Sequence, residues 1–117
     1  MTEANFEFKQ TKKGPVLVIE LLGYLGKEGG IAFAAIIEKS LAGGNRKFGL
    51  DFRRVDVINS QGISVLLEVG SRICEDFGGA LAVFGLNPHL KLILEISCFF
   101  SFATTAQGEA EALKALE

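Results

Sequence analysis

The sequence predicts an α/β domain with a mixed, mostly parallel β-sheet of about five strands and about four α-helices. Short apolar runs of strand length alternate with longer segments in which apolar residues recur every three or four positions. Strands that alternate with helices need crossover connections, which place the strands parallel. Hydrophobic residues make up 49% of the 117 residues, enough to build a core at this length. We therefore expect one domain over residues 1–117.

The N-terminal quarter is predicted to hold two strands and a loop. Residues 6–8 alternate apolar and polar side chains, as in an edge strand, and residues 12–15 form a turn around a Gly-Pro pair. The continuous apolar run at 16–19 is typical of a strand covered on both faces. The glycine-rich stretch at 23–30 is interpreted as a flexible β–α connection.

The middle of the chain contains the clearest helix. A first helix is predicted at 31–41 and ends at Gly43-Gly44, and a strand follows at 48–52. Residues 60–77 then show helical spacing of apolar positions, and this helix ends at Gly78-Gly79.

The last third of the chain is again predicted to alternate strands and helices. A buried strand is predicted at 80–84, and Asn87 before a proline opens a short helix to about residue 96. Another strand is predicted at 99–103. Thr104 with Gln107 resembles a capping box, so a last helix should follow through Leu116.

The polar turn Asn59-Ser60-Gln61-Gly62 is the most informative stretch of the chain. It lies where a strand-like segment ends and the 60–77 helix begins. A serine at this junction can cap the helix through its hydroxyl. It is also well placed to carry phosphate, because free backbone N–H groups and the positive end of the helix dipole point at it. Ser60 is therefore a cap, a phosphoacceptor, or both in turn.

Composition excludes several classes of function. The formal net charge is −2 and the basic residues are scattered, which argues against nucleic-acid binding. No apolar run approaches the roughly 18 residues needed to span a bilayer. The stretch Met1–Asn5 has neither a basic start nor a long apolar run, so no signal peptide is predicted and a cytoplasmic location is expected.

The two cysteines, Cys74 and Cys98, lack the spacing of a metal or redox motif. They are interpreted as free, mostly buried thiols in a reducing compartment, and a disulfide between them is the less favoured alternative. The apolar segment Cys98-Phe99-Phe100 is a candidate contact for a homodimer.

No catalytic constellation is visible, so no enzyme activity, metal or cofactor is predicted. The lone His89 follows Pro88 in a first helical turn and is interpreted as a solvated helix residue rather than a base. Asp51 and Asp56 could face one end of the sheet, but solvated strand-end residues are the favoured interpretation over an acid–base pair. The loop at 23–30 does not match a phosphate-binding loop.

The segment from Val55 to Ile63 resembles the signature of STAS domains, especially bacterial anti-sigma factor antagonists, which typically have apolar residues, Asp, Ser, a small residue and Gly. The resemblance extends over nearly the full chain, through Gly78-Gly79 and Asn87-Pro88 to the region 92–100. It implies an antagonist that binds a partner-switching anti-sigma factor, which is also a serine kinase. The kinase would inactivate the antagonist at the serine matching Ser60, and a phosphatase would reverse this.

Three features depart from the family pattern. Asn59 stands where an aspartate usually precedes the serine, and Tyr24 and Gly26 stand where the first loop usually has acids. Gln61 is larger than the usual small residue. The candidate partner surface around Ser60 consists of Tyr24, Gly26, Asn59, Gln61, Gly62, Ser64 and Val65. The alternative is a STAS scaffold or small-ligand module that works without phosphorylation.

Val65 and Val69 fall at the edge of the polar face of the 60–77 helix. An exposed apolar pair this close to Ser60 is a candidate docking patch, although scattered exposed valines are also common. Val65→Asp is then expected to abolish partner binding with little change in melting temperature. Ser64, one turn beyond Ser60, is interpreted as a solvated position rather than a second modification site.

Overall fold

The alternation of strands and helices predicted from the sequence is present in a computed structural model, which describes residues 6–117. Five strands and four α-helices form the fold, with one turn of π-helix and one of 3-10 helix. The prediction about Met1–Asn5 falls outside the described residues. In chain order the elements are β1 Phe6–Lys13, β2 Val16–Leu25, α1 Lys27–Ala42, β3 Lys47–Ile58, α2 Ser60–Ser71, η1 Arg72–Asp76, β4 Ala80–Phe84, α3 Pro88–Ile96, η2 Phe99–Ser101, β5 Ala103–Ala106 and α4 Glu109–Ala115.

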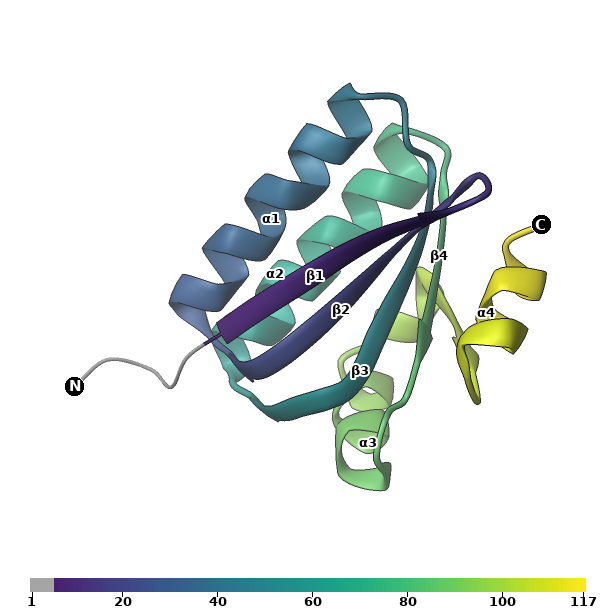
Figure 1. The fold of residues 1–117 in the computed structure, drawn as a ribbon. Helices are drawn as coiled ribbons and strands as arrows, with labels where there is room; N and C mark the ends of the chain where they lie inside the picture. Colours follow the sequence, from purple (N-terminus) through teal and green to yellow (C-terminus); the bar gives the residue numbers. More distant parts are fainter. Residues whose placement is uncertain (1–5) are drawn as a thin grey trace.

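The strands form a single sheet in the order β1-β2-β3-β4-β5 (Figure 1). β1 pairs antiparallel with β2, and every other neighbouring pair is parallel. This confirms the prediction of a mixed, mostly parallel sheet. The sheet has two edges: β1, whose eight residues are mostly exposed, and β5, which has four residues.

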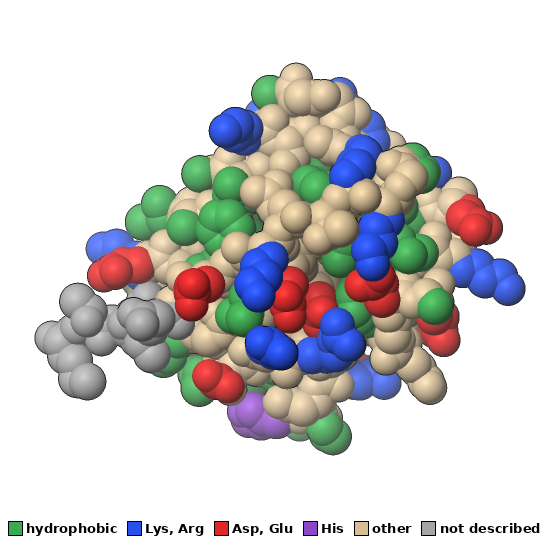
Figure 2. Space-filling view, in the orientation of Figure 1, with side chains coloured by type: hydrophobic (Ala, Val, Ile, Leu, Met, Phe, Trp, Pro, Cys, Tyr) green, Lys and Arg blue, Asp and Glu red, His purple; other side chains and the backbone are tan. Residues whose placement is uncertain are grey.

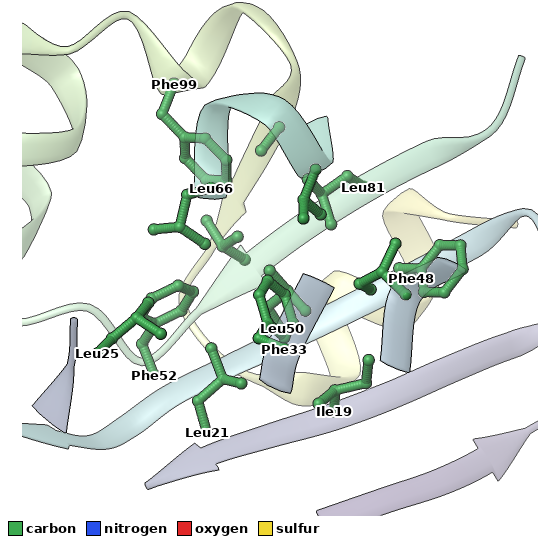
Figure 3. Packing of buried hydrophobic residues seen from close by; sticks show 14 of the residues in the cluster. Ile19, Leu21, Leu25, Phe33, Phe48, Leu50, Phe52, Leu66, Leu81 and Phe99 are labelled. Atoms are coloured by element: carbon green, nitrogen blue, oxygen red, sulfur yellow. The ribbon is translucent and has the colours of Figure 1, made fainter. Parts of the chain in front are cut away.

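The helices divide unequally between the two faces of the sheet. α1 and α2 lie side by side on one face, and α4 lies apart from them (Figure 1). Buried residues of α1, α2 and α3 join one hydrophobic cluster, whereas Ala112 and Leu116 at α4 join a second cluster with Val16 and Val18 of β2. Figure 3 shows the larger cluster, in which side chains of β2 and β3 meet Phe33 of α1 and Leu66 of α2.

The uncovered part of the second sheet face is charged. Asp51 is only 2% exposed, and its carboxylate accepts hydrogen bonds from Nε and Nη2 of Arg53 and from the Arg53 backbone N–H. This hydrogen bond and the charge of the carboxylate raise the pKa of Arg53. Figure 2 shows basic and acidic side chains interspersed on this side of the molecule. Because Asp56 is exposed while Asp51 is buried and paired, these carboxylates do not form an acid–base pair.

The interpretation of residues 23–30 as a loop is wrong. β2 continues to Leu25, and α1 begins at Lys27, so Gly29 and Gly30 are helical. The two glycines let α1 approach its neighbours: a Cβ at Gly29 would lie 2.7 Å from Cγ of Phe6, and one at Gly30 would lie 2.8 Å from Cγ2 of Val65. Glycine here serves close packing between elements, not a flexible connection.

The predictions for residues 99–107 are also wrong. Phe99–Ser101 is a turn of 3-10 helix, and the strand lies later, at Ala103–Ala106. Thr104 is therefore in β5, and α4 begins after Gly108 with no side-chain cap. Phe99 is fully buried in the core, so its ring cannot contribute to the dimer contact that the apolar segment suggested.

Both cysteines are free thiols, but they differ in exposure. Cys74 is half-buried and its Sγ lies 3.3 Å from the carbonyl oxygen of Phe102. Cys98 is exposed and has a positive φ of 67°, so the expectation that it is buried is wrong. Burial raises the pKa of the Cys74 thiol, and the charge of Glu75 adds to this effect.

These environments predict unequal thiol reactivity. The thiolate is the reactive form, and the raised pKa of Cys74 lowers its population at mildly alkaline pH. Cys98 should react with an aromatic disulfide reagent at least about tenfold faster than Cys74. Absorbance of the released thiolate measures both phases. Cys98→Ser should remove the fast phase and Cys74→Ser should retain it; a fast phase that survives in Cys98→Ser would contradict this assignment.

No helix within residues 6–117 combines the length and the apolar character needed to cross a membrane.

Candidate functional site

The Ser60 turn lies where two strands end and two helices begin. β2 ends at Leu25 and β3 ends at Ile58, and these neighbouring parallel strands lead into α1 and α2. The backbone N–H of Asn59 donates a 3.2 Å hydrogen bond to the carbonyl oxygen of Leu25. This bond fixes the turn against the end of β2. The Leu25 carbonyl was not predicted, because a backbone acceptor carries no side-chain signal in the sequence.

Asn59, not Ser60, caps α2. The Asn59 Oδ1 accepts a 2.9 Å hydrogen bond from the backbone N–H of Gly62, and its backbone carbonyl accepts from Ile63. Ser60 is the first helical residue. The alternative in which the Ser60 hydroxyl caps the helix is therefore wrong. An asparagine satisfies the N-cap position as well as a serine does, which leaves the serine without that structural task.

The Ser60 hydroxyl is exposed and unused by the fold. Among residues 6–117 it makes no side-chain hydrogen bond, although the Ser60 carbonyl accepts a 3.1 Å bond from the hydroxyl of Ser64. Gln61 and Ser64 are exposed beside it. An exposed hydroxyl in the first turn of a helix can accept a phosphate without loss of a structural contact, and a negative charge there is favoured by the helix dipole.

Two of the predicted partner residues are buried. Gly26 and Gly62 are both inaccessible, so neither offers a surface to a partner. A Cβ at Gly62 would overlap the carbonyl oxygen of Leu25 and lie 2.9 Å from its carbonyl carbon. The glycine of the motif thus allows α2 to start directly against the end of β2. Its role in this structure is packing.

The exposed valine pair predicted on α2 does not exist. Val69 is 4% exposed and belongs to the core. Val65 is half-buried and packs against the core, with its Cγ2 facing Gly30 of α1. The prediction failed because a second helix covers the edge of the polar face. α2 is contacted both by the sheet and by α1, so its buried arc is wider than the apolar stripe indicated.

Tyr24 lies beside the cap. Its hydroxyl is 3.4 Å from Nδ2 of Asn59, and Tyr24 pairs with Val57 at the end of the β2–β3 ladder. The Asn59 amide therefore contacts both the first turn of α2 and the end of β2. Tyr24, Asn59, Ser60, Gln61 and Ser64 are all uncharged, so none of the accessible predicted residues supplies an acid or a base.

The cap predicts a measurable loss of stability on substitution. Asn59→Ala should lower the free energy of unfolding by about 1 kcal/mol, whereas Asn59→Asp should retain it because aspartate caps equally well. Urea denaturation measures both. Asn87 caps α3 in the same way, through a 2.8 Å bond from the Leu90 N–H, and Asn87→Ala is the matched comparison. An unchanged midpoint for Asn59→Ala would show that the cap contributes nothing.

The other candidates from the sequence lie away from this site. His89 is exposed in the first turn of α3. Within the described part of the chain, no group of three or more His, Cys, Asp or Glu side chains could hold a metal ion.

Comparison with solved structures decides the fold. A Thermotoga maritima structure named as an anti-sigma factor antagonist superposes with a TM-score of 0.84 at 19% identity, over 93% of each chain. SpoIIAA, an anti-sigma factor antagonist, matches in its unphosphorylated form with a TM-score of 0.73 at 16% identity, over 95% of this chain and 96% of that one. The phosphorylated form of the Bacillus protein SpoIIAA gives 0.73 at 19% identity, over 97% and 100%. The chain has the STAS fold.

Sequence comparison agrees with the fold. The chain is 34% identical over 74 residues to BtrV of Bordetella bronchiseptica, which is named as an anti-sigma factor antagonist. The match covers 63% of this chain and spans 63% of the length of that curated relative. No family model matches the chain.

Proposed function

We propose that this STAS domain, residues 1–117, is an anti-sigma factor antagonist that acts by partner switching in the cytoplasm. Its partner is an anti-sigma factor with serine kinase activity, and phosphorylation of Ser60 ends the interaction. One observation carries the proposal: in this fold, the Ser60 hydroxyl is exposed at the start of α2 and has no structural task. The named function of BtrV and the existence of SpoIIAA in a phosphorylated form support it.

The switch acts through charge rather than through a change of fold. Transfer of the γ-phosphoryl group of ATP to the Ser60 oxygen adds about −1.5 to −2 charges. The folded chain tolerates this charge at a helix N-terminus. A partner surface that is docked against a neutral hydroxyl does not, because it meets a bulky, hydrated anion. A phosphatase that hydrolyses the phosphoserine restores binding.

Phosphate mapping tests the proposal. The chain is incubated with its anti-sigma factor kinase and ATP, and the modified residue is located by mass spectrometry. We expect one phosphate on Ser60, its loss in Ser60→Ala, and its retention in the neighbouring variant Ser64→Ala. Ser60→Glu should weaken binding to the kinase at least about a hundredfold. An active kinase that leaves Ser60 unlabelled would contradict the mechanism.

A second candidate function follows from the lack of acids among the predicted site residues. Tyr24, Gly26 and Asn59 stand where the resemblance implies acids, and any kinase contact that needs those acids is missing. The candidate is a STAS scaffold or ligand module that binds its partner without phosphorylation. If this second candidate function is correct, Ser60→Ala and Ser60→Glu would both retain function in vivo. Under the first candidate, the two variants would have opposite phenotypes.

A further inference from the structure

A hollow lies away from the Ser60 turn, at the carboxyl ends of β4 and β5. Its volume is about 460 Å³. Gly85 and Leu86, which follow β4, form one part of its wall, and Thr105 and Gln107 at the end of β5 form another. None of its lining residues belongs to the Ser60 site. The volume falls within the range of about 300–1,000 Å³ that is typical of small-molecule sites.

The sheet topology explains why a hollow forms here. After β4 the chain enters α3, whose buried leucines join the larger cluster with α1 and α2. After β5 it enters α4, which packs in the second cluster on the other face. The two connections thus leave the sheet toward opposite faces. Because the two connections diverge, a hollow is left between them at the carboxyl ends of β4 and β5, and ligands of open α/β sheets commonly bind outside the carboxyl ends of the strands.

Four polar side chains line the hollow. Lys91 comes from α3 and Glu111 from α4, with Thr105 and Gln107 between them. Among residues 6–117, none of the four makes a side-chain hydrogen bond or an ion pair. All four are exposed.

Two ion pairs elsewhere in the described residues connect separate secondary-structure elements. Lys13 pairs with Glu109 and ties the start of α4 to β1. Arg72 pairs with Glu38 at 2.8 Å and ties η1 to α1. Lys91 and Glu111 are also opposite charges on two elements at one hollow, yet they remain apart. Their separation leaves a cation and an anion that both face the same space.

We propose that this hollow binds a small zwitterion of amino-acid size. The Lys91 ammonium group recognises the carboxylate of the ligand, and the Glu111 carboxylate recognises its ammonium group. The Thr105 hydroxyl and the Gln107 amide donate and accept further hydrogen bonds. A ligand with both charges satisfies both helices at once, whereas a simple anion or cation leaves one of them unpaired. This site is independent of Ser60 and of the proposed partner switch.

Nuclear magnetic resonance titration of the full chain tests the site. Glycine, L-serine and L-glutamine are the probes, and acetate and methylammonium are the two half-ligands. At least one amino acid should shift the backbone amides of Gly85, Leu86, Thr105 and Ala106, with a dissociation constant in the millimolar range or below. It should bind at least about tenfold more tightly than either half-ligand. Equal binding of acetate, shifts that map elsewhere, or no shifts would each overturn the proposal.

Matched variants identify the charges responsible. Lys91→Met and Glu111→Gln should each weaken amino-acid binding at least about tenfold. Lys114→Met on α4 and Glu95→Gln on α3 remove equivalent exposed charges outside the hollow, and they should bind as the unmodified chain does. Melting temperatures of all four variants show whether each is folded. Binding that is unchanged in folded Lys91→Met and Glu111→Gln would overturn the assignment.

Discussion

Gly62→Ala is expected to destabilise the domain by about 3 kcal/mol or more, although it adds a single methyl group. The added Cβ overlaps the carbonyl oxygen of Leu25 and lies 3.2 Å from Cγ2 of Ile58. A carbonyl in a strand cannot rotate away as a flexible side chain can, so α2 must shift from the end of β2. That shift also strains the bond from the Asn59 N–H to the same carbonyl. Urea denaturation gives the free energy of unfolding directly.

Gly108→Ala is the matched control for this prediction. Gly108 has a φ of −156°, which alanine also adopts, and no atom lies within 4 Å of a Cβ at this position. Its substitution should lower stability by no more than about 1 kcal/mol, because the added methyl group meets no atom and the only cost is that alanine is a poorer N-cap residue for α4 than glycine. If Gly62→Ala were as stable as Gly108→Ala, the close approach of α2 to β2 would be refuted.

Val65→Asp is expected to cost about 2–3 kcal/mol of stability, the reverse of what the sequence pattern indicated. The side chain packs between α2 and α1, with Cγ2 facing Gly30. A carboxylate there loses hydration in a mostly apolar environment. Thermal melting followed by circular dichroism measures the loss. A melting temperature close to that of the unmodified chain would show that Val65 faces solvent.

Ser64→Asp provides the comparison for the valine, because it places the same charge at the adjacent exposed position. It should leave the domain folded with nearly unchanged stability. Because Val65→Asp is expected to destabilise the fold, a loss of partner binding in that variant does not identify Val65 as a docking residue. Gln61→Asp, at an exposed position next to Ser60, is the variant that probes the docking surface without disturbing the core.

Periodicity and turn residues predicted most of the fold. The helix that begins at Ser60, which continues as α2 and η1 to Asp76, and the Asn87 cap of α3 were predicted because their signals are local: helical spacing in one case, an asparagine before proline in the other. The glycines at 29 and 30 were misread because glycine indicates a loop locally, while here it serves contacts with Phe6 and Val65 that are distant in sequence. Such packing contacts leave no local pattern.

The candidate sites likewise combine features that leave a local sequence signal with features that do not. The position of Ser60 was predicted because a helix start can be read from neighbouring residues. That Asn59 rather than Ser60 accepts the Gly62 N–H could not be read, since both residue types cap helices. The hollow at β4 and β5 was missed because it depends on which face each helix covers. Which face a helix covers depends on the arrangement of all the strands in the sheet. In addition, none of the side chains that line the hollow belongs to a recognisable motif.

The two edges of the sheet limit how copies of this chain can assemble. β1 has an unpaired side, but it carries Lys9, Lys12 and Lys13, and lysines on an edge strand oppose the approach of another strand. β5 has only four residues, too few to template a long ladder. Extension of the sheet from one molecule into the next is therefore disfavoured at both ends. Even at high local concentration, we expect the chain to associate through side chains on its helices and turns, which leaves each contact reversible.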